Sequence, residues 1–327
     1  MSLEEKVGQL LLVRTPDINQ LDTIRNYHIG GYILFKRDID GKTKQDLINY
    51  INSFQSVSKI PLLIAIDEEG GEVTRLSYNK KIVDTPFLSP KELYDAGGFD
   101  KIKEDATNKL NLLTELGINL NLAPVADIVT DKESYMYNRS FSSDAIKTSE
   151  YIKTVLSTQK DEVSYVLKHF PGYGDNANTH EDITIDNRSY EDIENKDLVP
   201  FDVGIKNGAN AILVSHNVVT SVENKPASIS RNMHNILRNK LNFEGVIITD
   251  DLDMEGIKKY STATPNIDAI LAGNNILIVS DVETAYNEIL NGVKEGKISE
   301  ELINRLVLKN LEFKIKKNLT SKFYCPL

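Results

Sequence analysis

The sequence contains a single cysteine, Cys325, which excludes an intrachain disulfide and any metal site built from several cysteines. It has no apolar run near the roughly 18 residues of a membrane-spanning helix, and no apolar signal-peptide stretch near Met1. Positive charge is scarce, because 38 Lys and Arg stand against 48 Asp and Glu, a formal net charge of −10. Nucleic acids and anionic membranes bind basic surfaces, so we expect neither as a partner. We expect a cytoplasmic protein, or a secreted one if a leader preceded Met1.

Several motifs of nucleotide-binding and hydrolytic proteins are also missing. No G-x-S-x-G sequence is present, so a catalytic triad of the α/β-hydrolase kind has no support. No G-x-G-x-x-G follows an apolar run and there is no Walker sequence, which argues against dinucleotide and nucleoside triphosphate cofactors. A metal site made from His169, His216 and a carboxylate remains an alternative, although no His-x-His pair lies near the first apolar run. We therefore predict no cofactor and no metal.

Short apolar runs that alternate with amphipathic stretches make up most of the chain. The runs are residues 9–13, 31–35, 62–66, 118–122, 163–167, 211–214, 246–248 and 276–279. Most are continuous in Ile, Leu and Val, as parallel strands covered on both faces should be. The stretches that we predict as helices are residues 18–26, 43–57, 101–116, 145–159, 190–207, 230–241, 265–272, 284–295 and 300–317. Eight strands alternating with helices predict an α/β fold, a (β/α)8 TIM-type barrel forming one domain over residues 1–327, with a doubly wound open sheet as the alternative.

Polar and titratable residues collect directly after the apolar runs. They are Asp67 and Arg75 after the third run, Asp127 and Arg139 after the fourth, Lys168 and His169 after the fifth, His216 after the sixth, and Asp250 and Asp251 after the seventh. The fifth run leads into a Gly- and Pro-rich segment that ends at a further histidine, His180. Active sites of barrels lie at the carboxyl ends of the strands, so we expect these side chains to share one site.

The predicted site is a set of carboxylates and hydrogen-bonding cations, which suits a neutral polyhydroxylated substrate. In such a site one carboxylate attacks or stabilises an oxocarbenium-like centre, and a second group protonates the leaving oxygen. Asp250 is the best candidate for the nucleophile, because it follows a strand and precedes a second aspartate. The alternative for Asp250 is a carboxylate that only accepts structural hydrogen bonds at the end of a strand.

A series of longer motifs occurs in a fixed order along nearly the whole chain. The motifs are LEEKVGQL at 3–10, IGGYILF at 29–35, DEEGG at 67–71, NLAPVAD at 121–127, RSF at 139–141, KHFPG at 168–172, PAS at 226–228 and GVIITDDL at 245–252. In this series the sequence resembles a glycoside hydrolase of family 3, of the single-domain β-N-acetylhexosaminidase type.

The resemblance implies a retaining exo-β-N-acetylglucosaminidase that hydrolyses terminal β-linked N-acetylglucosamine, a small carbohydrate substrate of the kind met in peptidoglycan recycling. It makes Asp250 the nucleophile, which forms a glycosyl-enzyme, and His180 the acid/base. By the same resemblance the sugar is held by Asp67, Arg75, Arg139, Lys168 and His169.

The sequence departs from the family pattern near the proposed acid/base. The family usually has an aspartate two residues before the loop histidine, where this chain has Asn178. A carboxylate orients the imidazole and raises its pKa, whereas an amide supplies no charge. Asp175, Glu181 and Asp182 are candidate replacements. Three alternatives therefore remain open: a related family 3 β-glycosidase, a phosphorylase that transfers the glycosyl group to phosphate, and an amino-sugar-binding barrel of low activity.

Overall fold

The computed structural model describes residues 1–176, 184–253, 257, 259–261 and 264–316. Its strands lie where the apolar runs predict them. They are β1 (Leu11–Arg14), β2 (Gly31–Leu34), β3 (Leu63–Ile66), β4 (Leu120–Asn121), β5 (Ser164–Tyr165), β6 (Leu167–Phe170), β8 (Ala211–Val214), β10 (Val246–Thr249) and β11 (Leu277–Val279). Two further short strands, β7 (Ile185–Asp186) and β9 (Val218–Val219), pair with each other outside this set.

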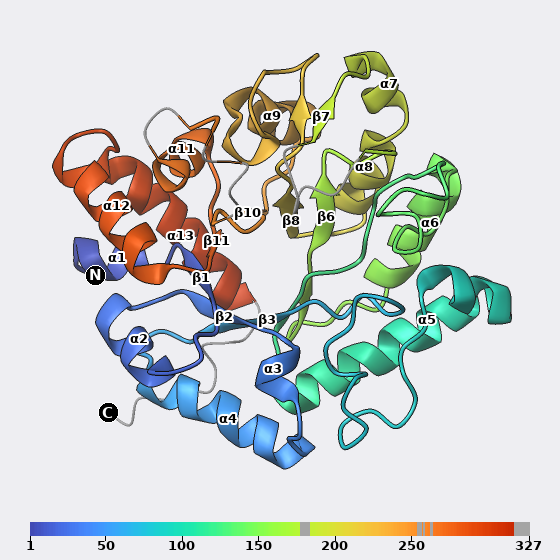
Figure 1. Ribbon diagram of the computed structural model, residues 1–327, viewed down its shortest axis with the longest axis horizontal. Coiled ribbons are helices and arrows are strands. Elements are labelled where there is room, and N and C mark those ends of the chain that lie inside the picture. The colour runs from blue at the N-terminus through green and yellow to red at the C-terminus, as the bar shows by residue number, and fades with distance from the viewer. Residues whose placement is uncertain (177–183, 254–256, 258, 262–263, 317–327) are drawn as a thin grey trace.

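The strands form a closed parallel ring that helices surround (Figure 1). One sheet has the order β11-β1-β2-β3-β4-β5 and the other has the order β10-β8-β6. β5 and β6 are two pieces of one strand separated by Val166, and a parallel bridge between Ile248 and Ile276 joins β10 to the start of β11. The ring therefore closes with eight strand positions among the described residues. The predicted (β/α)8 barrel is confirmed, and the doubly wound alternative is wrong.

Most helices follow the predicted amphipathic stretches, while three predicted helices differ in extent or continuity. The helices are α1 (Leu3–Gly8), α2 (Gln20–Tyr27), α3 (Lys36–Ile39), α4 (Lys44–Val57), α5 (Pro90–Leu116), α6 (Ala145–Leu156), α7 (Tyr190–Asn195), α8 (Leu198–Lys206), η1 (Ala227–Ile229), α9 (Arg231–Asn235), η2 (Ile236–Lys240), α11 (Pro265–Ala272), α12 (Val282–Lys294) and α13 (Glu300–Lys316). Of these, α1, α3 and η1 were not predicted. α5 begins earlier than predicted and is kinked at Gly97 and Gly98. The predicted helix 190–207 is two helices, because Pro200 lacks an N–H and is tolerated only in a first turn, here that of α8. The predicted helix 230–241 is α9 followed by a π-helical turn.

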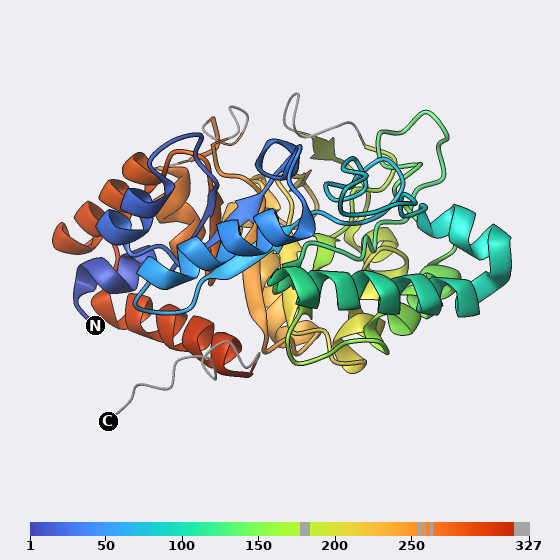
Figure 2. The ribbon, with the colours of Figure 1, turned by 90° about the horizontal axis from the view of Figure 1, so that it is seen from below.

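The interior of the barrel holds an apolar core of its own, which sets the position of the polar side chains above it. Its members include Leu12, Ile33, Ala65, Val166, Ile248 and Ile278. Side chains two residues apart on a strand point to the same face. The next inward positions are therefore Arg14, Phe35, Asp67, Lys168, Asp250 and Ser280. All six line one cavity at the carboxyl ends of the strands, on the side where the loops after β1 and β3 stand in Figure 2. We call these six residues the mouth layer.

The opposite end of the barrel is covered by α13, which carries a buried lysine. Phe313 belongs to the interior core, and the Nζ of Lys314 donates to Gln9 Oε1 at 2.8 Å and to the Gly30 carbonyl at 2.9 Å. Gln9 and Gly30 precede β1 and β2, so this contact lies at the amino ends of the strands. Burial, with no carboxylate partner among the described residues, lowers the pKa of Lys314 to about 7.

The lowered pKa of Lys314 predicts a specific pH dependence of stability. Between about pH 7 and pH 10 the unfolded chain carries a proton on this lysine and the folded chain does not, so the free energy of unfolding should rise with pH. Lys314 should contribute roughly 1.4 kcal/mol per pH unit to that rise. Urea unfolding at pH 7, 8 and 9 measures it, and Lys314→Met should remove the contribution. An equal pH dependence in both proteins would show that Lys314 stays charged when folded.

Candidate active site

The mouth layer forms one part of a cavity of about 480 Å³. The floor of the cavity is the top of the barrel core, with Ile33, Leu122, Leu213 and Ile278 exposed to it. Charged side chains make up much of the wall: Arg14, Asp67, Arg75, Arg139, Lys168, His169, Asp250, Asp251 and Asp253. The cavity is thus apolar below and charged at its rim, which suits a ligand that has both ring carbons and hydroxyl groups.

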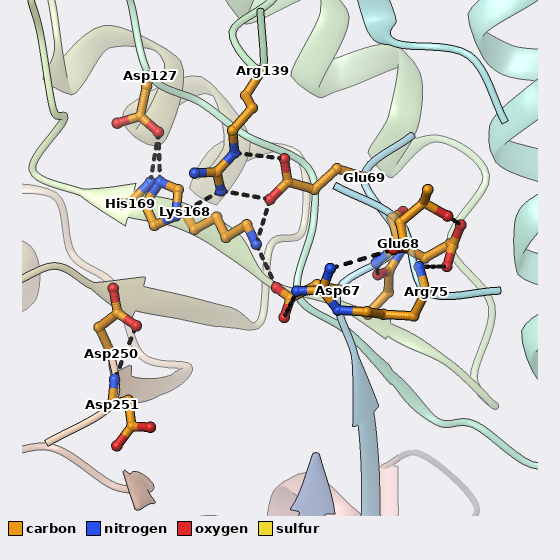
Figure 3. A network of polar contacts seen from close by, with 12 residues as sticks. Asp67, Glu68, Glu69, Arg75, Asp127, Arg139, Lys168, His169, Asp250 and Asp251 are labelled. Atoms are coloured by element: carbon orange, nitrogen blue, oxygen red, sulfur yellow. Dashed lines mark hydrogen bonds and ion pairs between the residues drawn. The ribbon is translucent and has the colours of Figure 1, made fainter. Parts of the chain in front are cut away.

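A buried carboxylate, Glu69, holds two of the cations together (Figure 3). Arg139 donates to it from Nε at 3.1 Å and from Nη2 at 2.7 Å, in a bidentate pair. Lys168 reaches the same carboxylate at 2.7 Å and also reaches Asp67 at 2.7 Å. Glu69, Arg139 and Lys168 are all buried. We call Asp67, Glu69, Arg139 and Lys168 the charged network.

The ionisation of the charged network follows from these contacts. Burial alone would raise the pKa of Glu69, but Arg139 and Lys168 outweigh it and hold that pKa far below its ordinary value. Burial alone would lower the pKa of Lys168, but Asp67 and Glu69 outweigh it and raise that pKa. Glu69, Lys168 and Arg139 therefore stay charged at neutral pH, and each cation is fixed in direction by a carboxylate.

His169 is oriented by Asp127, which is fully buried. Asp127 Oδ2 lies 2.7 Å from His169 Nδ1, and its other oxygen accepts the Tyr173 backbone N–H at 2.7 Å. Arg139 Nη2 lies 3.3 Å from His169 Nε2. Because a guanidinium can only donate, Nε2 must accept and Nδ1 must carry the hydrogen bonded to Asp127. His169 is therefore held from both sides, by Asp127 at Nδ1 and by Arg139 at Nε2.

The loop after β3 is shaped by Glu68, the neighbour of Glu69. The Glu68 carboxylate is fully buried, and one of its oxygens accepts the backbone N–H groups of Arg75 and Leu76, each at 2.8 Å. This folds the loop back on itself and brings the Arg75 guanidinium within 3.5 Å of Asp67. Arg75 Nε is buried and has no hydrogen-bond partner among the described residues.

Asp250 and Asp251 stand apart from the charged network in Figure 3. Asp250 Oδ1 accepts the Asp251 backbone N–H at 2.9 Å. Asp251 Oδ2 accepts the Ser280 hydroxyl at 2.7 Å, and the Asp251 carbonyl lies 2.8 Å from His216 Nε2. Burial is the main cause that raises the pKa of Asp251. Asp251 thus braces the turn after β10, while Asp250 belongs to the mouth layer.

The start of the segment that leads towards residue 180 is held by an ion-pair cluster. Arg188 lies 2.7 Å from Asp186 and 2.8 Å from Asp197. Gly174 has φ +57°, and a Cβ there would come within 2.7 Å of Arg188 Nη2. A larger residue at Gly174 would therefore collide with the guanidinium, so this glycine allows the close approach.

The structure brings together six of the seven predicted site residues: Asp67, Arg75, Arg139, Lys168, His169 and Asp250 all line the cavity. His180, together with Asn178, Glu181 and Asp182, lies outside the described residues. Asp175, a candidate replacement for the missing dyad aspartate, accepts the backbone N–H groups of Thr130 and Asp131 at 2.6 and 2.8 Å. The Asp175 carboxylate therefore stabilises the loop after β4 by accepting its backbone N–H groups.

Two residues of the site were not predicted from the sequence, Glu69 and Arg14, and Asp127 was expected at the site without a partner or a role. Nothing in the sequence separates Glu69 from Glu68, since both follow Asp67 in the same loop. Asp127 belongs to a quoted motif, but its partner His169 lies 42 residues away. Arg14 could have been found, because it follows the first apolar run as Asp67 follows the third.

The residues that the structure describes contain neither a metal-binding cluster nor a membrane-spanning helix. Within them, no group of three or more His, Cys, Asp or Glu side chains is arranged to hold a metal ion. No helix in that part of the chain is long and apolar enough to cross a membrane. The absence of a metal and of a cofactor stays a prediction.

Comparison with known proteins agrees with this architecture. The profile of the "Glycosyl hydrolase family 3 N terminal domain" matches residues 2–311. A "Beta-hexosaminidase" of Nitrosomonas eutropha is 30% identical over 298 residues, which cover 88% of this chain and 85% of that protein. A solved family 3 β-N-acetylglucosaminidase from Paenibacillus sp. superposes with a TM-score of 0.91 at 30% identity, covering all of this chain and 65% of that one.

A solved β-N-acetylhexosaminidase from Beutenbergia cavernae matches almost end to end. The TM-score is 0.84 at 27% identity, with 96% of this chain and 98% of that one covered. The family profile and the barrel together lead to one conclusion: this chain is a member of glycosyl hydrolase family 3 and therefore a glycosidase.

Proposed function

We propose that the chain is a retaining exo-β-N-acetylglucosaminidase, which removes terminal β-linked N-acetylglucosamine through a glycosyl-enzyme on Asp250. The observation that carries the proposal is one cavity whose wall includes Asp250 together with three members of the charged network, Asp67, Arg139 and Lys168. Support for the sugar comes from relatives named "Beta-hexosaminidase" and from similar structures of β-N-acetylglucosaminidases.

The charged network fits a neutral sugar because its own charges are already paired. Lys168 keeps one N–H donor beyond the two that reach Asp67 and Glu69, and Asp67 keeps acceptor positions towards the cavity. His169, whose Nδ1 hydrogen bonds to Asp127, adds a fixed ring at the same wall. These groups can bind hydroxyl groups without a net charge on the ligand, and they cost little reorganisation when the sugar enters.

The proposed reaction has two displacements. In the first, an Asp250 oxygen forms a bond to the anomeric carbon while the bond to the leaving oxygen breaks, and that oxygen takes a proton from the His180 imidazolium. In the second, water attacks the anomeric carbon, gives a proton to neutral His180, and releases Asp250 as a carboxylate. The sugar keeps its β-configuration because each displacement inverts it once.

Release of p-nitrophenol tests the proposal. The β-N-acetylglucosaminide should be hydrolysed at least tenfold faster, in kcat/KM, than the β-glucoside, and added phosphate should not change the sugar product. Preference for the glucoside would favour a related β-glycosidase. A glycosyl phosphate product would identify a phosphorylase, and binding of N-acetylglucosamine without turnover would identify a binding barrel.

Asn178 provides a prediction about the acid/base. Asn178→Asp should place a carboxylate beside His180, stabilise the imidazolium and raise its pKa by about 1 unit. The first displacement needs the imidazolium, so the alkaline limb of the pH profile of kcat/KM should move to higher pH by the same amount. Asn176→Asp, two residues earlier, is the matched control for added charge. An alkaline limb that does not move in Asn178→Asp would mean that Asn178 does not contact His180.

A further inference from the structure

The cations of the cavity differ in how far their charges are already balanced. Arg139 is paired with Glu69, Lys168 is paired with Asp67 and Glu69, and Arg75 lies 3.5 Å from Asp67. Arg14 also lines the cavity, but its guanidinium forms no ion pair or hydrogen bond with any residue that the structure describes. Among the described residues, the Arg14 guanidinium carbon lies over the ring of Phe35, 4.3 Å from the ring centre.

The barrel itself directs Arg14 into the cavity. Leu12 points into the barrel core, and Arg14 follows two residues later on β1, so it shares the mouth layer with Asp67, Lys168 and Asp250. The cation–π contact with Phe35 holds the guanidinium against the ring and uses none of its N–H donors, which stay available to a ligand. Arg14 is therefore a positioned part of the site with unused donors.

A guanidinium with free in-plane donors matches a carboxylate or a phosphate, which it binds through two parallel hydrogen bonds. Neutral hydroxyl groups do not require such a charge, and the charged network already supplies donors for them. We infer that Arg14 recognises an anionic substituent, a phosphate ester on the primary hydroxyl of the sugar that occupies the cavity. This inference rests on the proposed function.

The position of β1 in the ring assigns the anion to the sugar rather than to the leaving group. β1 lies four strand positions from β5–β6 in either direction around the barrel. His180, the proposed proton donor to the leaving oxygen, follows β6 in the chain, so the leaving group should face the β6 side. Arg14 should then face the part of the sugar away from the anomeric carbon, where the primary hydroxyl extends beyond the ring.

Kinetics on paired substrates tests the inference. The substrates are p-nitrophenyl β-N-acetylglucosaminide and its 6-phosphate. The proteins compared are wild type, Arg14→Met, Arg14→Lys and the control Lys36→Met. Lys36→Met removes an exposed cation just after β2. The wild type should favour the phosphorylated substrate by about 10- to 100-fold in kcat/KM. Arg14→Met should abolish that preference, Arg14→Lys should retain part of it, and Lys36→Met should keep it.

A binding measurement gives a second readout that does not depend on turnover. N-acetylglucosamine 6-phosphate should inhibit wild type more strongly than N-acetylglucosamine, and Arg14→Met should remove the difference. The inference is overturned if wild type hydrolyses the neutral substrate without preferring the phosphate. It is also overturned if Arg14→Met lowers kcat/KM for both substrates by the same factor, because Arg14 would then not recognise the phosphate.

Two further outcomes separate the inference from the proposed function. If neither substrate is hydrolysed but both sugars bind, the proposed function fails, and the Arg14-dependent difference in inhibition still decides the inference. A matched pair of aglycones, 4-carboxyphenyl and 4-carbamoylphenyl, tests the assignment to the sugar. An Arg14-dependent preference for the carboxylate there would overturn that assignment and place the anion on the leaving group.

Discussion

Asp250→Ala should reduce kcat for the β-N-acetylglucosaminide by about 10⁴-fold or more, because it removes the proposed nucleophile and leaves only substrate positioning. Fold and binding should survive, since Asp250 lies at the open end of the barrel and its backbone N–H donates to the Val214 carbonyl whatever the side chain. Steady-state kinetics with p-nitrophenyl and dinitrophenyl glycosides measures the loss, and circular dichroism checks the fold.

The neighbouring aspartate is the matched control for this experiment. Asp251 accepts the Ser280 hydroxyl and the Asp253 backbone N–H, so Asp251→Asn disturbs the turn without removing the nucleophile. We expect a loss of roughly tenfold, far smaller than the loss in Asp250→Ala. If Asp251→Asn were the inactive protein and Asp250→Ala the active one, the nucleophile would be assigned to the wrong member of the pair.

Glu69→Gln should destabilise the protein by about 3 kcal/mol and raise KM at the same time. The substitution leaves Arg139 without its buried carboxylate partner and leaves Lys168 with Asp67 alone, and breaking a buried ion pair in this way typically costs 3–5 kcal/mol. Both cations line the cavity, so their loss of direction should weaken sugar binding. Urea unfolding measures the loss of stability, and steady-state kinetics measures the rise in KM.

Glu115→Gln is a control with the same chemistry in a different setting. Glu115 pairs with Lys44 at 2.9 Å, but both side chains are 40% or more exposed. Glu115→Gln should lower the free energy of unfolding by less than about 1 kcal/mol and leave KM unchanged. Equal destabilisation in the two variants would mean that the charged network contributes no more than a surface ion pair. A double-mutant cycle with Arg139→Met would isolate the Glu69–Arg139 coupling.

The fold could be predicted from the sequence because parallel strands buried on both faces have a local pattern. Continuous apolar runs located every strand of the ring, and the alternation of side chains then accounts for the inward direction of Asp67, Lys168 and Asp250. These residues were predicted to share a site because barrel strands end on one side.

What escaped prediction depends on contacts between distant parts of the chain. Glu68 and Glu69 are equivalent in sequence, and only the folded loop turns one towards its own backbone and the other towards Arg139, 70 residues away. Asp127 is paired with His169 for the same reason. The break between α7 and α8 was foreseeable from Pro200, which cannot occupy a helix interior without cost.

Trapping the covalent intermediate tests the central claim most directly. A 5-fluoro-N-acetylglucosaminyl fluoride should form the glycosyl-enzyme quickly and release it slowly, so the protein should gain one sugar mass that fragmentation locates. We expect the label on Asp250 in wild type and no label in Asp250→Ala. A label on any other residue, or rapid turnover with inversion and no labelled protein, would contradict it.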